Sequence, residues 1–120
     1  MSRGYKSIAA DGHECYSLAE RTIDDWLSVH AIPHEREPRY PFHPVLNPNE
    51  GLRADWKVGN YYIEYFGLLN DPEYQAKANN KVNLAHAAGF SLMAILPEDI
   101  LDLDTKYANL LSEFRSLRDL

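Results

Sequence analysis

Apolar and polar residues recur along the chain at spacings that predict where its secondary structure lies. Helical spacing begins after Ser17 and places Ile23 and Leu27 on one face. Ser17 also stands three residues before Glu20, which is the spacing of a helix capping box. We therefore expect a first helix from Ser17 onward, preceded by a loosely tied N-terminal arm over residues 1–16.

The middle of the chain predicts three strands. Residues 31–42 contain prolines at positions 33, 38 and 41, which favour an extended edge strand over a central one. Two short apolar runs, residues 52–58 and 61–66, flank Gly59 and Asn60, which suit the turn of a hairpin. These strands would form one side of a sheet.

The last part predicts a helix, a strand and a further helix. Asp71 and Pro72 are typical of a helix start, and Gly89 is typical of a helix end. The apolar run over residues 90–96 predicts a strand buried on both faces. A final helical stretch over residues 98–118 carries one apolar stripe. The element order αβββαβα predicts an α/β sandwich, with a central mixed sheet flanked by helices.

Size and composition are those of one globular domain. The chain has 120 residues, of which 45% are hydrophobic and 25% charged. Its net charge of −6 argues against a protein that coats nucleic acid, but not against an enzyme whose metal ion supplies positive charge. A single cysteine, Cys15, favours a reducing compartment. Because no apolar run approaches the ~18 residues of a membrane span and no signal peptide is evident, we expect a cytoplasmic protein without membrane association.

Two carboxylates stand in the apolar runs of the predicted hairpin. Asp55 and Glu64 flank the turn at Gly59 and Asn60, so strand pairing brings them opposite or nearly opposite each other. Side chains placed in this way lie roughly 5 to 8 Å apart at Cβ, which is close enough to share one divalent ion. Two oxygen ligands and several waters suit Mg²⁺. The alternative is a solvated Asp55 paired with Arg53 and an outward-pointing Glu64, and the residues alone leave both open.

A lysine on the second predicted helix also stands out. Each helical residue advances about 100°, so Lys81 falls within about 20° of Tyr74 and in one stripe with Ala78 and Val82. A lysine on a buried face either reaches a partner or extends its head to water. Lys77 lies one turn earlier, nearer the edge of the stripe. Helical spacing does not choose between the two explanations.

The order of these residues resembles the PD-(D/E)XK nuclease superfamily, whose fold is called restriction-endonuclease-like. The pattern "DGH…S..E..I..WL…I.H", followed by "D…YIEYFG…Y……K…GF", is similar to bacterial, archaeal and phage members. The resemblance covers about Ser17 to Pro97 and implies a nuclease domain over residues 17–120. The superfamily's strand lysine is missing, because the triplet that begins at Glu64 is Glu-Tyr-Phe. Similar members carry this lysine on the following helix, where Lys81 stands.

The resemblance implies hydrolysis of DNA phosphodiester bonds by a water that Mg²⁺ or Mn²⁺ activates. It implies that Asp55 and Glu64 bind the metal, with the Tyr65 carbonyl as an extra ligand. Lys81 would orient the attacking water and shield the charge of the scissile phosphate. Glu20 would hold a metal-bound water or a second ion, although its capping position explains it equally well. The alternative is an inactive module of the same fold that binds nucleic acid or protein.

Basic residues near the expected site are candidate phosphate contacts, or else a solvated face that balances the acids. They are Arg36, Arg39, Arg53, Lys57 and Lys77. A homodimer through the last helix would allow two copies to cut two strands.

A rival metal site has spacings that zinc allows. Its ligands would be His13, Cys15, His30 and His34. However, His30 lies on a predicted helix and His34 follows a proline in extended chain. Because scattered histidines around one cysteine are more often not metal ligands, we expect these residues to hold no zinc. We expect His13 to brace the arm against the first helix.

Overall fold

The structure is a computed structural model, and it describes residues 7–106 and 108. The chain forms two compact units. Unit 1 comprises Met1–His34 and Pro97–Leu120, and unit 2 comprises Glu35–Leu96. Among the described residues, no helix combines the length and the apolar character that crossing a membrane requires.

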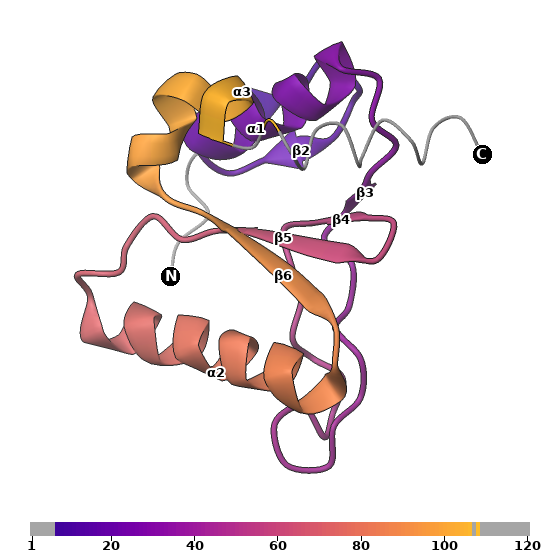
Figure 1. Cartoon of the computed structure of the whole chain (residues 1–120), viewed down its shortest axis with the longest axis vertical. Helices are drawn as coiled ribbons and strands as arrows, with labels where there is room; N and C mark the ends of the chain where they lie inside the picture. Colours follow the sequence, from indigo (N-terminus) through magenta and orange to yellow (C-terminus); the bar gives the residue numbers. More distant parts are fainter. Residues whose placement is uncertain (1–6, 107, 109–120) are drawn as a thin grey trace. The chain divides into compact units, whose positions relative to one another are not determined.

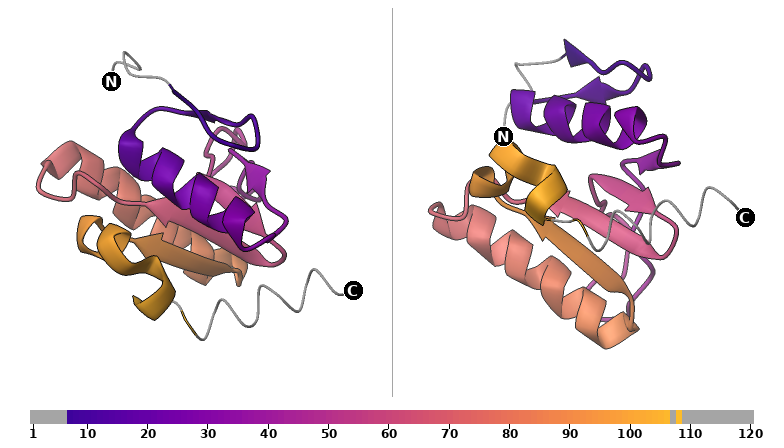
Figure 2. Two further views of the ribbon diagram at one scale, coloured as in Figure 1. Left: turned by 90° about the horizontal axis from the view of Figure 1, so that it is seen from above. Right: turned by 45° about the horizontal axis from the view of Figure 1, so that its top comes forward.

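The described part of unit 1 consists of a hairpin, a long helix and short helical segments. Its elements are β1 (Ser7–Ile8), β2 (Glu14–Cys15), α1 (Leu18–Val29), the 3-10 helix η1 (Pro97–Asp102) and α3 (Leu103–Lys106). β1 and β2 pair antiparallel, and the hairpin lies along α1 (Figure 2). Residues 7–15, expected to belong to a loose arm, therefore form a hairpin that packs on α1.

The start of α1 follows the predicted capping pattern. Ser17 is the N-cap, and its Oγ accepts the N–H of Glu20 at 3.0 Å. In return, Glu20 Oε1 accepts the N–H of Tyr16 at 3.2 Å. Because each bond satisfies a backbone donor near the start of the helix, this pair of bonds stabilises the first turn. The predicted helix start is confirmed.

The final predicted helix is described only in its first part. η1 and α3 cover residues 97–106 of the stretch expected to be helical over 98–118. The rest of the apolar stripe lies outside the described residues: Tyr107, Leu110, Leu111, Phe114 and Leu117. A dimer through this helix therefore stays a prediction.

In its described residues, unit 2 is a mixed four-stranded sheet with one helix. Its elements are β3 (Glu35–Arg36), β4 (Trp56–Val58), β5 (Tyr61–Tyr65), α2 (Pro72–Ala88) and β6 (Ser91–Ile95). The strand order is β3-β4-β5-β6, antiparallel except for the parallel pair β5 and β6, which α2 connects. Figure 1 shows α2 alongside β6, which it contacts. The expected α/β class and mixed sheet are confirmed, and the elements after the first hairpin follow the predicted order.

Local signals set the boundaries of α2. Asp71 is its N-cap and accepts the N–H of Glu73 at 3.0 Å, and Pro72 occupies the first turn. Gly89 ends the helix in the left-handed conformation at φ 74°, which costs glycine little because it has no Cβ. Both predicted ends of this helix are confirmed.

The prediction that the last strand is buried on both faces is wrong. β6 is an edge strand in the described sheet, as β3 is at the other edge. Along β6, Met93 and Ile95 are buried, whereas Ala94 between them is exposed and Leu92 is only partly buried. This alternation is typical of a strand with one covered face.

An aromatic cluster fills the interior of unit 2. Tyr40, Tyr62 and Leu84 are buried, and Phe90 packs against them. The ring centroids of Tyr40 and Tyr62 lie 4.8 Å apart, and Phe90 lies 5.4 Å from Tyr40 and 4.8 Å from Tyr62. Because these rings exclude water, charges placed beside them interact more strongly than they would in solvent.

Candidate functional site

The register of β4 and β5 places Asp55 across from Glu64. Trp56 pairs with Ile63, and the N–H of Asp55 donates to the Ile63 carbonyl at 3.2 Å. Continuing this register by one residue places Asp55 opposite Glu64. Asp55 Oδ2 also accepts the N–H of Tyr65 at 2.8 Å. The structure therefore brings the two predicted carboxylates to one end of the hairpin.

Glu64 is a buried carboxylate in contact with side chains from outside the hairpin. It is 2% exposed. Lys81 of α2 places its Nζ 2.8 Å from Glu64 Oε2, and the hydroxyl of Tyr40 donates to the same oxygen at 2.7 Å. A buried charge is costly unless it is paired and hydrogen-bonded. The lysine and the phenol together offset this cost, and Lys81 therefore reaches an acidic partner, as one of its two explanations requires.

The charges of both acids also act on nearby phenols. Burial raises the pKa of the Tyr40 phenol far above its usual range, and the charges of Glu64 and Asp55 raise it further. Burial likewise raises the pKa of Tyr74 against the opposing effect of a hydrogen bond from Gly67, and both acids add to the increase. Tyr40 therefore remains a hydrogen-bond donor to Glu64 across the ordinary pH range.

The Tyr65 carbonyl, the predicted extra metal ligand, lies at the same end of β5. It accepts the hydroxyl of Tyr74 at 3.0 Å. Carbonyl oxygens are among the ligands that Mg²⁺ accepts in proteins. Tyr74 in turn accepts the N–H of Gly67 at 3.1 Å, which anchors the chain that leaves β5 to α2.

Arg36, which belongs to β3, contacts the Asp55 segment. Its Nη1 donates to the backbone carbonyl of Asp55 at 2.7 Å and lies 3.9 Å from Asp55 Oδ1. The guanidinium also lies over the Trp56 ring, 4.8 Å from its centroid. Arg36 therefore positions the Asp55 segment, while its charge faces the carboxylate.

The other predicted phosphate contacts lie toward the surface. Lys57 is half-buried, with its Nζ 5.2 Å from the ring centroid of Tyr62. Arg39 and Arg53 are exposed and face each other across an isolated bridge. Lys77 is exposed on α2, one turn before Lys81. Their role as phosphate contacts stays a prediction.

Glu20 lies in unit 1. Its described contacts are those of the helix cap: its carboxylate accepts the N–H of Tyr16, and its own N–H donates to Ser17 Oγ. These contacts account for the residue without a catalytic role, which stays a prediction.

A second cluster, in unit 1, combines carboxylates with imidazoles. Its members are Asp11, His13, Asp24 and His34, each of which offers a ligand atom within 4.8 Å of the others. Asp24 is fully buried on α1, with Oδ2 3.1 Å from His13 Nδ1 and Oδ1 3.4 Å from His34 Nε2. Asp11 Oδ2 lies 2.9 Å from His13 Nδ1 and 2.7 Å from His34 Nε2. This cluster could hold a metal ion.

Local structure explains how these residues meet. Asp11 and His13 lie in the connection between β1 and β2, where Gly12 adopts φ 93° and allows a tight turn. The N–H of His13 donates to Asp11 Oδ1 at 3.0 Å, which fixes the turn. Asp24 stands beside Ile23 on the buried face of α1. The contact of His13 with Asp24 confirms that His13 braces this segment against the first helix.

The electrostatics of His34 reflect this environment. Burial, the largest single effect, lowers its pKa. The hydrogen bonds that His34 donates to Asp24, to the Ile32 carbonyl and to Asp11, together with the charge of Asp24, raise the pKa by more. The result is a pKa of about 9. Without a bound cation, His34 therefore carries a proton near neutral pH and partly neutralises the acids.

The zinc ligands weighed from spacing are only partly brought together. His13 and His34 meet in the cluster, but Cys15 is buried with its Sγ 3.9 Å from the His13 carbonyl, and His30 Nε2 contacts Asp104 Oδ1 at 3.0 Å. The grouping of Cys15 and His30 with the other histidines is therefore wrong. The sequence reasoning missed Asp11 and Asp24, although a carboxylate next to Ile23 on an apolar helix face was a usable signal.

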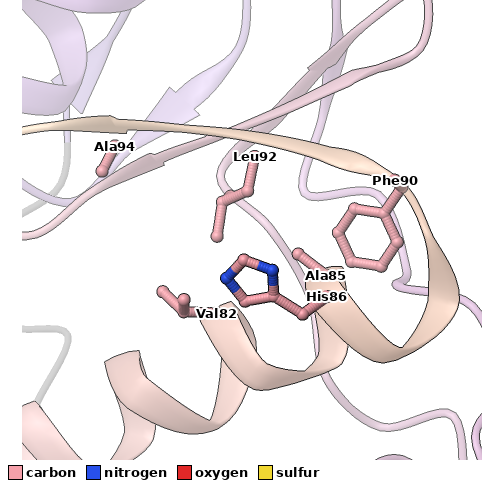
Figure 3. A pocket seen from close by; sticks show the side chains of 6 residues that line it. All are labelled: Val82, Ala85, His86, Phe90, Leu92 and Ala94. Atoms are coloured by element: carbon pink, nitrogen blue, oxygen red, sulfur yellow. The ribbon is translucent and has the colours of Figure 1, made fainter.

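Unit 2 also contains a hollow. It opens between α2 and β6, and the side chains that line it are shown in Figure 3: Val82, Ala85, His86, Phe90, Leu92 and Ala94. This lining is apolar except for His86. The hollow therefore offers no acid or lysine for chemistry.

Comparison with models of protein families, with curated proteins and with solved structures finds no match to this chain.

Proposed function

We propose that the protein is a metal-dependent nuclease of restriction-endonuclease-like fold that hydrolyses DNA phosphodiester bonds. The observation that carries this proposal is the 2.8 Å contact of Lys81 Nζ with Glu64 Oε2, with Asp55, the residue before β4, across the hairpin from Glu64. Two acids on a hairpin and a lysine on the following helix are the residues that the resemblance requires. In this proposal, Lys81 of α2, which contacts Glu64, takes the role of the lysine that the strand lacks.

The oxygens at this end of the hairpin fit a hard divalent cation. Glu64, Asp55 and the Tyr65 carbonyl are the groups that would hold Mg²⁺. Glu64 would do so through Oε1, since its Oε2 accepts Tyr40 and Lys81. When bound, the ion would polarise the phosphate and lower the pKa of a coordinated water. Carboxylate and carbonyl oxygens are the ligands that this ion prefers.

The protein's own residues then have distinct tasks. Tyr40 holds the Glu64 carboxylate in place through its hydrogen bond. Arg36 holds the Asp55 segment through the backbone carbonyl. Lys81 has a side chain that is 21% exposed, so its ammonium sits at the border of the buried acid and solvent. From there it would orient the attacking water and neutralise charge on the scissile phosphate.

A non-catalytic module of the same fold is the second candidate. The observation that favours it is that Lys81 and Tyr40 already satisfy Glu64 Oε2. An ion pair of this kind compensates the buried Glu64 charge whether or not a cation is bound. Such a module would bind nucleic acid or protein without cutting.

The two candidates are separated by a cleavage assay. Supercoiled plasmid and single-stranded DNA are incubated with Mg²⁺ or Mn²⁺ and with wild type, Asp55→Asn or Glu73→Gln, all purified identically. Glu73 is an exposed acid on α2 and provides the matched control. We expect metal-dependent cutting by wild type and Glu73→Gln, and none by Asp55→Asn.

Other outcomes contradict the nuclease. Cutting by all three proteins identifies a contaminant. No cutting, together with no Mn²⁺ binding that depends on Asp55 in calorimetry, supports the non-catalytic module.

A further inference from the structure

We propose that Asp11, His13, Asp24 and His34 form a structural site for one divalent transition-metal ion of the zinc class. The site lies within unit 1 and shares no ligand with the proposed nuclease site, so it does not rest on the proposed function. It departs from the sequence-based expectation that these histidines bind no zinc. The reason is that two carboxylates, rather than Cys15 and His30, complete the set.

The distances between the ligand atoms are close to those around a tetrahedral ion. Zinc binds imidazole nitrogen and carboxylate oxygen at about 2.0–2.2 Å, which separates neighbouring ligand atoms by about 3.3 Å. The contacts of Asp11 Oδ2 with the two imidazole nitrogens measure 2.9 and 2.7 Å, and those of Asp24 measure 3.1 and 3.4 Å. These four distances lie within about 0.6 Å of the tetrahedral value, and all the ligand atoms lie within 4.8 Å of one another, so the cluster has the size of a metal site.

Surrounding groups orient the ligands. His34 Nδ1 lies 2.8 Å from the Ile32 carbonyl, so an Nδ1–H donates there and Nε2 is the nitrogen that faces the acids. An ion bound at Nε2 would replace the proton of that nitrogen. Metal-binding histidines in general donate their second ring N–H to a carbonyl or carboxylate in this manner. Ser28 Oγ donates to Asp11 Oδ2 at 3.1 Å. The cluster thus has the supporting hydrogen bonds of a metal site.

The donor set selects the class of ion. Two carboxylates carry a charge that one divalent cation neutralises, and the Asp24 side chain is fully buried. Calcium and magnesium favour oxygen ligands throughout, whereas imidazole favours zinc and its neighbours in the first transition row. Four protein ligands leave no open position, and closed tetrahedral sites are structural rather than catalytic.

The expected consequence is stabilisation of unit 1. Asp11 and His13 belong to a hairpin whose strands have two residues each, and isolated hairpins are marginally stable in water. Asp24 belongs to α1, and His34 to the chain that leaves α1. One ion would cross-link these segments, and its binding energy would add to the stability of the folded state.

The rival explanation is a purely hydrogen-bonded cluster in which protonated histidines balance the acids. It predicts no bound metal. The first experiment purifies the 120-residue chain without an affinity tag or added metal. Elemental analysis then measures how much metal is bound per chain. Titration with Zn²⁺ against a chromophoric chelator then gives the affinity, and Co²⁺ absorption reports the coordination geometry.

Variants locate the site. Asp11→Asn and His13→Gln alter the more exposed ligands, so they keep the test valid if changes at buried Asp24 prevent folding. His86→Gln, on exposed α2 surface, is the matched control. Changes to groups that only support a metal ligand cost about 10- to 100-fold in affinity. We expect at least that loss in both ligand variants and no change in the control.

Three results would support the site: wild type binds zinc tightly, its Co²⁺ form shows the visible absorption bands of a tetrahedral site, and a chelator lowers its melting temperature. Failure of wild type to bind zinc at micromolar concentration would overturn it. Equal affinity in His13→Gln and wild type would also overturn it, because the ion would then lie elsewhere. Asp55→Asn should bind zinc as wild type does, whatever its cleavage activity.

Discussion

Replacing Lys81 by alanine tests the ion pair at the centre of the proposed nuclease site. Lys81 Nζ lies 2.8 Å from Glu64 Oε2, and the Glu64 side chain is 3% exposed. At an effective dielectric constant of about 20, unit charges at this separation attract each other by about 6 kcal/mol. Much of this attraction is offset by the cost of removing both charges from water. The change in unfolding free energy therefore depends on how well the remaining Glu64 carboxylate is compensated.

The alanine variant leaves a buried carboxylate with less compensation. Removing one partner of a buried pair costs roughly 3–5 kcal/mol. Because the Lys81 side chain is 21% exposed and Tyr40 still donates to Glu64, we expect the lower end. The free energy of unfolding should fall by about 3 kcal/mol. Adding Glu64→Gln removes the uncompensated charge, so the double variant should recover about half of the loss.

Urea denaturation followed by circular dichroism measures these free energies. Lys77→Ala, on the exposed side of the same helix, is the control and should change stability by less than about 0.5 kcal/mol. In the cleavage assay, Lys81→Ala should abolish cutting while Mn²⁺ still binds. If Lys81→Ala costs no more than Lys77→Ala, or if Glu64→Gln restores nothing, the ion pair does not hold Glu64 and the reasoning is refuted.

Two further changes test the hydrogen bond of Tyr40 and the end of α2. Tyr40→Phe removes a hydrogen bond to a charged carboxylate and should cost about 1.5–3 kcal/mol near neutral pH, measured by urea denaturation. The pKa of Tyr40 is raised in the folded state, so its contribution to stability is present below pH ~10 and is lost as pH rises beyond the unfolded pKa. The difference in unfolding free energy between wild type and Tyr40→Phe should therefore shrink in alkali. A constant difference would contradict this. Gly89→Ala places a Cβ on a residue with φ 74°, and no other atom lies within 4 Å of that Cβ. We expect a loss of about 1 kcal/mol in thermal denaturation, which would come from backbone strain alone. No loss would argue against a left-handed helix end.

The parts of the fold that local chemistry determines were predictable. Ser17, Asp71 and Gly89 act on backbone groups a few residues away, so the ends of α1 and α2 follow from neighbouring residues. The Gly59 turn likewise sets the register of β4 and β5, and with it the placement of Asp55 across from Glu64. The edge position of β6 was not predictable in this way, because it depends on which strand lies beside it in the finished sheet.

Tyr40 shows the same limit within the site. It stands 24 residues before Glu64 and is followed by a proline-rich loop, so no periodicity connects the two. Its phenol meets the carboxylate only because the loop returns to the sheet. The Asn47 side chain assists this return, since its Nδ2 donates to the carbonyls of Tyr40 and Pro41 at 3.2 and 2.8 Å. A contact that depends on loop closure carries no local signal.

Lys81 and Asp24 illustrate what a charged residue on a buried helix face can reveal. Each stands among apolar neighbours on its helix, and burial without compensation would cost several kcal/mol. The position alone therefore implies a compensating partner. For Lys81 the partner was an acid already suspected from the hairpin, so the pair could be inferred. For Asp24 the partners are His13, which precedes α1 in the sequence, and His34, which follows it. Such a residue shows that a buried polar cluster exists, while its members become known only when the chain is folded.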